Sequence, residues 1–308
     1  MFFPRGPGPL VSIMLPTRGR PSHLLAAIDS AVSLATDHTN IEWLLKIDDD
    51  DIPTIKAVEE LHRAFPSLNL KWVVSPRGDG YFAMHHWIND LANRATGDWL
   101  FLFNDDARFK TQGWDVTLSI MGTKNPWIGI SDICLLVAPT IDRPFAQEFF
   151  FLRRKTVDIL GHLSLSPHND NWIHTVMNFV GAKLQTSIEI EHLSAVIDDD
   201  IRKSTVEAYK TTILSMETIE ARRLLWEDAN TLLSHMERLE KRVQWTDAPL
   251  SGDCGYFLRV KGGRQEICFI HGGTLYLLET NEKHEAVPKV VDVAPKGLWA
   301  PMNACMGA

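Results

Sequence analysis

Two runs of acidic side chains are the clearest candidates for chemistry in this chain of 308 residues. Four aspartates at positions 48–51 follow the apolar run 43–47, and Asn104-Asp105-Asp106 follows the apolar run 99–103. If both runs are neighbouring strands of a parallel sheet, the acids meet at one edge and repel one another unless a cation compensates. Oxygen ligands suit Mg²⁺ or Mn²⁺, which also binds substrate phosphates. The pair of clusters therefore favours a cation site, although either cluster alone could cap a helix.

Apolar runs alternate with helical patterns through the first hundred residues. The pattern predicts strands at 10–15, 43–47, 71–74 and 99–103, and helices at 22–34, 55–64 and 82–95. This alternation indicates βαβ units, and hence an α/β fold of the Rossmann-like kind with a mainly parallel sheet and flanking helices. Ligands of such sheets bind beyond the carboxyl ends of the strands, where both acidic runs fall.

Beyond residue 114 the predicted secondary structure differs from the βαβ pattern of the first hundred residues. Short strands and loops are expected up to residue 151, followed by helices at 153–160 and 171–180 and a long helical stretch at 202–243. After residue 249, short apolar runs separated by glycine turns indicate a small antiparallel β module. The predicted domains are therefore 1–200, a long helical segment at 201–248, and a β-rich module at 249–308.

The second half of the long helical stretch carries an apolar seam with heptad spacing. Its members are Leu225, Ala229, Leu232, Met236, Leu239 and Val243. Only three heptad turns persist, so packing on the protein's own body is favoured over a dimeric coiled coil. A homo-oligomer formed through residues 225–243 is the alternative.

The composition excludes several classes of protein. A hydrophobic content of 45%, with 10 Trp and 14 Phe, indicates a folded chain with a large core. The formal charge of −8 disfavours a general nucleic-acid binder, because such proteins usually carry an excess of basic residues. The four cysteines, Cys134, Cys254, Cys268 and Cys305, form no C-x-x-C pair, which favours reduced thiols and a cytoplasmic location. No apolar run approaches the ~18–20 residues that cross a bilayer, so a soluble protein is expected.

The order of the motifs resembles that of family 2 glycosyltransferases. The run Val11-Ser12-Ile13-Met14-Leu15-Pro16-Thr17-Arg18-Gly19-Arg20 resembles the family's first strand and loop, with Pro-Thr and an Arg three residues after the Thr. Residues 89–97 resemble the helix that leads to the metal motif, and Asn104-Asp105-Asp106 stands where the DXD motif belongs. The resemblance covers about residues 10–200 and implies a GT-A fold, a nucleotide-sugar donor, a divalent cation and inversion at the anomeric carbon. Residues 77–115 are also similar to bacteriophage-encoded members, some of which glycosylate modified DNA bases.

The resemblance implies roles for individual residues. Contacts to the nucleotide sugar are expected from Pro16, Thr17, Arg20, Asp48, Asn89, Asn104 and Asp105. Arg77, in a glycine-rich turn, would neutralise the diphosphate leaving group. Asp106 and His192 would hold the metal, since His192 ends the alternating run 188–191 at the family's expected place. Four consecutive aspartates replace the family's Asp-Asp-Gly-Ser, which leaves open which of them faces the base.

Asp170, in the run His168-Asn169-Asp170-Asn171-Trp172, stands where the family has its general base. Inverting transfer requires one carboxylate to accept the proton of the acceptor hydroxyl while its oxygen attacks the anomeric carbon. The alternative role for Asp170 is a helix N-cap.

The sequence therefore predicts a metal-dependent, inverting glycosyltransferase that uses Mn²⁺ or Mg²⁺ and a nucleotide sugar, with a UDP-sugar as the expected donor. One alternative is a nucleotidyltransferase of related α/β fold, which the single glycine in residues 17–21 disfavours. The other is a non-catalytic nucleotide-sugar-binding module, which the combination of Asp106, Asp170 and His192 disfavours. The sequence does not identify the acceptor, and modified DNA stays a candidate despite the acidic charge.

Overall fold

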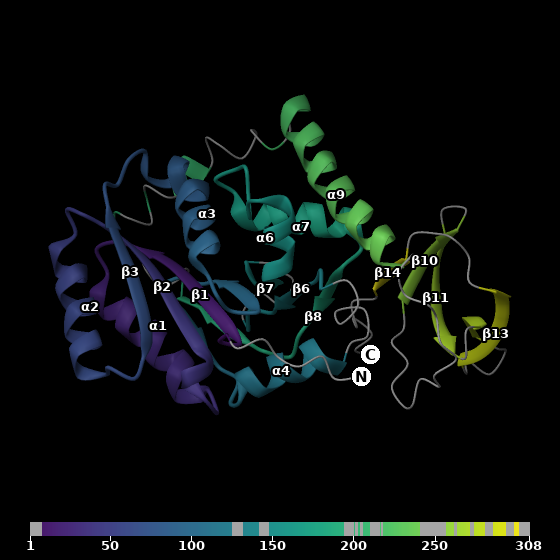
Figure 1. The fold of residues 1–308 in the computed structure, drawn as a ribbon, viewed down its shortest axis with the longest axis horizontal. Coiled ribbons are helices and arrows are strands. Elements are labelled where there is room, and N and C mark those ends of the chain that lie inside the picture. Colours follow the sequence, from purple (N-terminus) through teal and green to yellow (C-terminus); the bar gives the residue numbers. More distant parts are fainter. Residues whose placement is uncertain are drawn as a thin grey trace.

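The computed structural model describes residues 8–124, 132–141, 148–193, 200, 203, 206–209, 216, 218–240, 257–261, 264–271, 274–280, 286–293 and 299–301. Its centre is a seven-stranded sheet with the order β3-β2-β1-β4-β7-β6-β8 (Figure 1). These strands are β1 (Val11–Thr17), β2 (Ile41–Asp48), β3 (Asn69–Ser75), β4 (Trp99–Leu102), β6 (Leu135–Ala138), β7 (Phe149–Arg153) and β8 (Lys183–Gln185).

The central sheet is mainly parallel, as predicted. Strand β1 pairs in parallel with β2 and with β4, and β2 pairs in parallel with β3. Strand β7 is antiparallel to both β4 and β6, a feature that the sequence pattern did not predict. The strand order reverses between β1 and β4, and ligands of open α/β sheets bind at such a reversal, outside the carboxyl ends of the strands. The loops that follow Thr17 and Leu102 meet at this point.

Helices cover both faces of the sheet, and each face has its own apolar cluster. One cluster includes residues of α1 (Pro21–Leu34), α2 (Ile52–Ala64) and α4 (Trp114–Lys124). The other includes residues of α3 (Met84–Arg94), α6 (Arg154–Leu160), α7 (Asn169–Val180) and α9 (Ile219–Glu240). Successive strand residues alternate between them: Ile13 and Leu15 belong to the first cluster and Met14 to the second. The alternation follows from the period of two in a β-strand.

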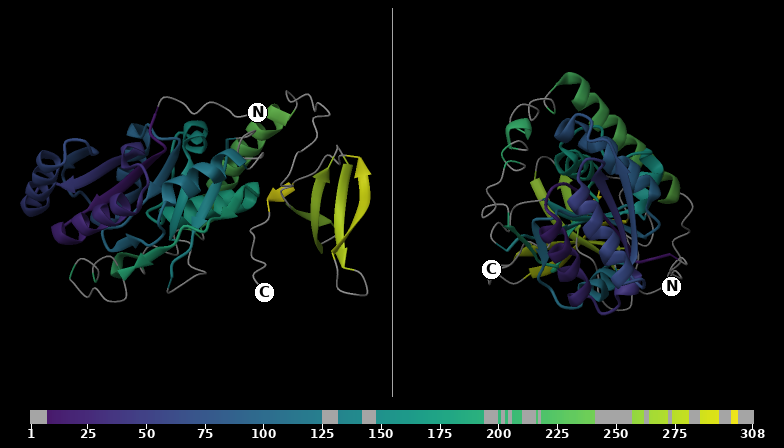
Figure 2. Two further views of the ribbon diagram at one scale, coloured as in Figure 1. Left: turned by 90° about the horizontal axis from the view of Figure 1, so that it is seen from below. Right: turned by 90° about the vertical axis from the view of Figure 1, so that its left-hand side faces the viewer.

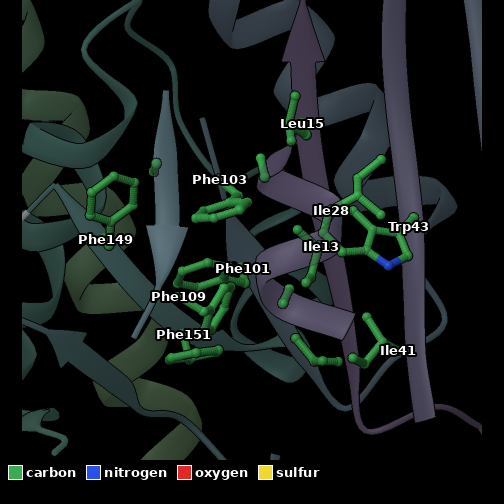
Figure 3. Packing of buried hydrophobic residues seen from close by; sticks show 14 of the residues in the cluster. Ile13, Leu15, Ile28, Ile41, Trp43, Phe101, Phe103, Phe109, Phe149 and Phe151 are labelled. Atoms are coloured by element: carbon green, nitrogen blue, oxygen red, sulfur yellow. The ribbon is translucent and has the colours of Figure 1, made fainter. Parts of the chain in front are cut away.

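Five phenylalanines fill the core beside the acidic loop at 104–106 (Figure 3). They are Phe101, Phe103, Phe109, Phe149 and Phe151. The rings of Phe101 and Phe151 stack at 4.3 Å between centroids, and those of Phe103 and Phe109 lie 5.1 Å apart. Aromatic pairs of this kind add about 0.5–1.5 kcal/mol beyond area burial. The loop between Phe103 and Phe109 is therefore anchored at both ends in a rigid core.

Two predictions about helices are wrong. Residues 114–124 form α4, where strands and loops were expected; Trp114 and Leu118, one turn apart, are buried, and the Trp114 indole donates to Ala31 O at 2.9 Å. The stretch 202–243 is not one helix, because α9 begins only at Ile219, where Thr218 Oγ1 accepts a hydrogen bond from Ala221 N at 3.1 Å. A threonine at this position caps the helix and fixes its start.

The apolar seam of α9 packs on the protein's own body, as favoured from the sequence. Leu225, Ala229 and Leu232 are buried in the second cluster, and Met236 packs against it. In Figure 1, α9 lies along α6 and α7, the two helices it contacts. These seam residues are therefore not available to a second copy of the chain. The side chains of Leu239 and Val243 lie outside the described residues.

The C-terminal strands form a separate five-stranded sheet, drawn from green to yellow in both views of Figure 2. They are β10 (Phe257–Lys261), β11 (Arg264–His271), β12 (Thr274–Thr280), β13 (Ala286–Val293) and β14 (Trp299–Pro301). All of their pairings are antiparallel, which agrees with the predicted β module. No helix in the described part of the chain has the length and apolar character needed to cross a membrane.

Candidate functional site

A cleft of about 520 Å³ lies at the carboxyl ends of β1, β2 and β4. Eight residues singled out from the sequence line it: Pro16, Thr17, Arg20, Asp48, Arg77, Asn104, Asp105 and Asp106. Residues not singled out also line it, among them Arg18, Lys46, Tyr81, Phe82, Met84 and Trp87. The reversal of strand order thus places the cleft where both acidic runs end.

The loops after β1 and β4 are joined by direct hydrogen bonds. Thr17 Oγ1 donates to Asp105 Oδ2 at 2.8 Å, and Arg20 Nη1 donates to Asp105 Oδ1 at 3.2 Å. The same Arg20 nitrogen lies 3.9 Å from Asp106 Oδ2. Both carboxylate oxygens of Asp105 therefore accept hydrogen bonds from the loop after β1. For Asp106, only Oδ2 faces Arg20, and Oδ1 faces His192.

Asp48, at the end of β2, lies between two cations and is separated by β1 from the loop after β4. Arg18 Nη1 donates to Asp48 Oδ2 at 2.8 Å, and the Lys46 ammonium contacts Asp48 Oδ1. Lys46 is buried, and its ammonium stands 3.9 Å from the centroid of the Trp87 ring, a cation–π arrangement. This part of the cleft combines a carboxylate, two cations and an aromatic face, which are groups that bind the polar edge and the flat face of a heterocycle.

Only Asp48, among the four consecutive aspartates, lines the cleft. Asp51 caps α2 by accepting from Thr54 N at 3.3 Å, and it also accepts from Gly19 N. Asp50 is exposed and pairs with the guanidinium of Arg18. Asp51 is therefore a helix cap, as the alternative interpretation expected. Asp48 is the aspartate of this run that faces the cleft.

A two-stranded antiparallel sheet brings His192 to Asp106. Strand β5 (Ala107–Phe109) pairs with β9 (Ile190–His192), with Ala107 opposite His192, and Leu193 N donates to Asp106 O at 2.8 Å. His192 Nε2 lies 3.3 Å from Asp106 Oδ1. Its other ring nitrogen, Nδ1, lies 2.6 Å from Glu148 Oε2.

The electrostatics of this pair favour a charged Asp106. Burial alone would raise the pKa of Asp106, but the hydrogen bond and charge of His192 lower it below its usual range. Burial likewise works against the protonated ring of His192, yet the carboxylates of Asp106 and Glu148 raise the pKa of His192 to about 9. Without a cation the ring is therefore protonated at neutral pH, and a divalent cation would displace the proton from Nε2. The ionised carboxylate and the neutral imidazole would then be a suitable donor pair.

The distance between the two donors fits a shared ion. Two ligands at right angles, each about 2.1 Å from an octahedral cation, stand about 3.0 Å apart, close to the 3.3 Å between Asp106 Oδ1 and His192 Nε2. Among the described residues, no group of three or more His, Cys, Asp or Glu side chains is arranged for a metal. A cation held by Asp106 and His192 would therefore take its further oxygen ligands from substrate phosphates or water, as Mg²⁺ sites commonly do.

Arg77 lies on the turn that borders the cleft after β3. Gly78 and Gly80 of this turn have φ of 55° and 58°, a backbone region that glycine adopts without strain. A Cβ on Gly80 would meet the Arg77 guanidinium at 3.4 Å. The exposed guanidinium is thus folded over its own turn at the edge of the cleft.

Asp170 lies in the first turn of α7, and His168 occupies the N-cap position. The N-cap alternative for Asp170 is therefore wrong. Burial is the largest cause that raises the pKa of Asp170 above its usual range. Its charge, after burial, contributes to the raised pKa of Tyr81, which lines the cleft. Asp170 is thus close enough to Tyr81 for its charge to act on that side chain, although Asp170 itself does not line the cleft.

Asn89 is the predicted contact residue that the structure does not bring to the cleft. Its side-chain carbonyl accepts from Leu163 N at 2.8 Å and Ser164 N at 3.1 Å, and its amide donates to Ser164 O at 2.7 Å. Both ends of the amide therefore hold the loop after α6. This contact joins α3 to the chain that leads into α7.

Lys46, Trp87 and Glu148 are among the residues of the site that the sequence analysis did not identify. Lys46 had one detectable signal, because a lysine two positions before Asp48 in an apolar strand shares its face. Trp87 lies on α3 and Glu148 immediately before β7, and neither stands in a motif. Their roles depend on contacts between distant parts of the chain.

Comparisons with known proteins identify similar folds. No family model matches the chain, and no curated protein matches it. A mannosyltransferase, PcManGT from Pyrobaculum calidifontis, solved with GDP-Man and Mn²⁺, is 14% identical with a TM-score of 0.49, over 77% of this chain and 88% of that chain. TarS residues 1–349 from S. aureus is 11% identical with a TM-score of 0.44, over 90% of this chain and 98% of that chain. These identities and TM-scores do not by themselves assign a function to this chain.

Proposed function

We propose that this chain is a metal-dependent glycosyltransferase of the GT-A type that transfers a sugar from a nucleotide-sugar donor to a hydroxyl acceptor, with inversion. The observation that carries the proposal is the 3.3 Å approach of His192 Nε2 to Oδ1 of Asp106, which lines the cleft in the loop after β4. Asp48, at the end of β2 on the other side of β1, and the ring of Trp87 line the cleft as well. A nucleoside diphosphate has groups that match both, with a heterocycle at one end and an anionic diphosphate at the other.

The donor lies along the cleft in this proposal. The base faces Asp48 and Lys46, and Thr17, Asn104 and Asp105 line the path toward the diphosphate. Arg20 and Arg77 supply positive charge to the phosphates, since guanidinium groups form charge-assisted bonds with them. UDP is the first nucleotide to test, because a single carboxylate such as Asp48 suffices to accept the one N–H on the edge of uracil.

Asp106 and His192 hold the cation, Mn²⁺ or Mg²⁺, which when bound neutralises charge that develops on the departing diphosphate. Asp105, joined to Thr17 and Arg20, keeps the loop after β4 in place. The buried aromatic residues on either side of this loop prevent it from shifting away from β9. The ligands are therefore held by two strands rather than by loops alone.

Asp170 is the general base in this proposal. It accepts the proton of the acceptor hydroxyl as that oxygen attacks the anomeric carbon and the bond to the nucleoside diphosphate breaks. Burial raises the pKa of Asp170, which makes its carboxylate a stronger proton acceptor than an exposed one. The acceptor approaches from the side of Tyr81, next to Asp170.

A screen of nucleotide sugars with Mn²⁺ tests the proposal. Release of a nucleoside diphosphate that increases with an acceptor panel, which includes modified DNA, supports glycosyl transfer. Asp106→Asn should abolish that release, and Asp90→Asn, an exposed residue paired with Arg94, serves as the matched control. Activity undiminished by EDTA contradicts the cation. A parallel reaction with nucleoside triphosphates and sugar 1-phosphates tests the alternative, because pyrophosphate release there, without nucleoside diphosphate release from nucleotide sugars, identifies a nucleotidyltransferase. Binding of nucleotide sugars without any release identifies a non-catalytic module.

A further inference from the structure

Glu148 contacts the proposed cation ligand His192 from the side opposite to the cation. Its Oε2 lies 2.6 Å from His192 Nδ1, and its side chain is 27% exposed. Glu148 stands immediately before β7, in which Phe149 is fully buried. The ring of Phe149 meets the imidazole edge-on, at 5.2 Å between centroids and an angle of 81°. The imidazole is thus fixed by a hydrogen bond and by an aromatic contact from consecutive residues.

The hydrogen bond determines which ring nitrogen faces the cation. A neutral imidazole has one N–H donor and one acceptor nitrogen. A carboxylate at Nδ1 makes that nitrogen the donor and leaves the lone pair on Nε2, the atom that lies 3.3 Å from Asp106 Oδ1. Carboxylates that orient metal-binding histidines in this way commonly raise metal affinity by 10–100-fold.

We propose that Glu148 is a positioning residue of the cation site, which holds His192 so that Nε2 faces the ion shared with Asp106. The inference rests on the proposed function, since it assigns Glu148 to the same site. Glu148 touches neither the donor nor the ion and acts only through His192.

Glu148 also stands within electrostatic reach of the proposed base. After burial and local hydrogen bonds, its negative charge adds to the rise in the pKa of Asp170. The charge of Glu148 therefore acts on the proposed base as well as on the cation ligand that it contacts.

Three variants separate positioning from general stability. Glu148→Ala removes both the acceptor atom and the charge, and Glu148→Gln retains an oxygen that accepts from Nδ1–H. The matched control is Glu191→Gln, next to His192 in the chain, because Glu191 is exposed and pairs with Lys110 at 3.0 Å. All three are compared with the wild type for folding by circular dichroism and thermal unfolding.

The first measurement is Mn²⁺ affinity by electron paramagnetic resonance, with Mn²⁺ alone and with Mn²⁺ plus saturating UDP. We expect Glu148→Ala to weaken Mn²⁺ binding by about 10–100-fold, Glu148→Gln to weaken it by less, and Glu191→Gln to leave it unchanged. A folded Glu148→Ala protein with wild-type affinity overturns the inference and leaves the proposed function intact. A wild type that does not bind Mn²⁺ under either condition contradicts the cation of the proposed function instead.

The second measurement needs no metal. In the metal-free wild type, the His192 Nδ1–H proton should give a hydrogen-bonded NMR signal, assigned by its loss in His192→Gln. Glu148→Ala should remove or shift this signal, and Glu191→Gln should not. An unchanged His192 signal in Glu148→Ala overturns the inference whatever the metal result, because it means that Glu148 does not orient the ring.

Discussion

Asp105 and Asp106 are adjacent in the sequence but lie in opposite electrostatic settings. Burial is the main cause that raises the pKa of Asp105, and its bonds to Thr17 and Arg20 only partly oppose that rise. For Asp106, burial is again the largest single cause, but the hydrogen bond and charge of His192, together with the charge of Arg20 and a backbone hydrogen bond, lower the pKa. The first carboxylate therefore serves to join the loops after β1 and β4, and the second keeps the charge that a cation site requires.

The substitution Asp170→Asn tests whether Asp170 is the general base. The amide preserves the shape of the side chain but does not accept a proton, so the transfer rate should fall by about 10²–10⁴-fold. Donor binding, measured by calorimetry with UDP and Mn²⁺, should change little. Asp158→Asn is the matched control, since Asp158 is partly exposed and pairs with Arg154 on α6. A variant that loses donor binding and keeps its transfer rate at saturation would place Asp170 in the donor site instead.

The pH profile of transfer follows from the same residue. Asp170 accepts a proton only when ionised, and its pKa in the folded protein is raised. The acid limb of kcat/KM should therefore lie above the usual carboxyl range of about 4, with activity lost as the pH falls through the raised pKa. Rates measured from pH 4 to pH 9 check this. A limb at the ordinary carboxyl pKa contradicts the assignment of Asp170 as the base.

Site residues that stand in a sequence motif were predictable, whereas those that reach the site only through side-chain contacts between distant elements were not. Thr17 and Asp48 end β1 and β2, and Asp106 lies in the loop after β4. The pattern of these strands is visible in the sequence, so the convergence of the three residues follows from the fold class. Glu148 and Trp87 enter the site through side-chain contacts between elements that have no motif. Asn89 shows the converse, because it stands in a matched stretch but holds a neighbouring loop.

Strands β1, β2 and β3 share one buried acid far from the cleft. Glu42 of β2 accepts hydrogen bonds from Ser12 on β1 and from the nitrogen and hydroxyl of Thr96, at 2.8 and 2.9 Å. Lys71 of β3 also donates to it at 2.6 Å. Burial opposes the ionised form, yet these donors together lower the pKa of Glu42. The carboxylate thus fixes three strands at the edge opposite to the site.

Glu42→Gln should lower the free energy of unfolding by about 1–3 kcal/mol at pH 7, because the amide leaves buried donors without an acceptor. Since the folded pKa is lowered, the stabilisation is complete above the unfolded pKa and is lost as the pH falls through the folded one. Urea unfolding at pH 7 and at several acid pH values should show the difference between wild type and variant shrinking. Asp90→Asn, at an exposed pair, should change stability by about 0.5 kcal/mol or less.

Helix α9 was predictable in its packing face but not in its start. The heptad spacing identified Leu225, Ala229 and Leu232, which are buried as expected. The start at Ile219 depends on the cap by Thr218, and a threonine in a continuous helical pattern gives a weak signal. For α4, the expectation of strands failed because prolines farther along, at 126, 139 and 144, dominated the pattern.

Leu232→Ala tests whether α9 is an integral part of the fold. The cavity beneath the helix should lower the free energy of unfolding by about 2–5 kcal/mol. Asn230→Ala, on the exposed side of the same helix, should change it by no more than about 0.5 kcal/mol. Equal effects of the two variants in urea unfolding would mean that α9 is not packed as described.

The described part of the chain contains three sheets, and every residue to which we assign a role in donor binding, cation binding or catalysis lies before position 200. We therefore expect the predicted module at 249–308 to select the acceptor or mediate assembly. A chain ending after Val243 should retain Mn²⁺-dependent binding of UDP and slow donor hydrolysis, and lose acceptor transfer or its oligomeric state. Circular dichroism establishes that the shortened chain is folded. Unaltered acceptor kinetics together with an unaltered mass by light scattering would mean that the module has neither role.

The pairing of β5 with β9 has a consequence for biosynthesis. Asp106 and its neighbours are synthesised long before His192, and β9 contributes only three residues to the pairing. As the chain leaves the ribosome, β1, β2 and β4 can assemble and complete the part of the cleft around Thr17 and Asp48. The part of the cleft that contains Asp106 is completed only after β9 has been synthesised and has paired with β5. Under the proposed function, the part of the cleft that faces the base would therefore be complete before the part that holds the cation.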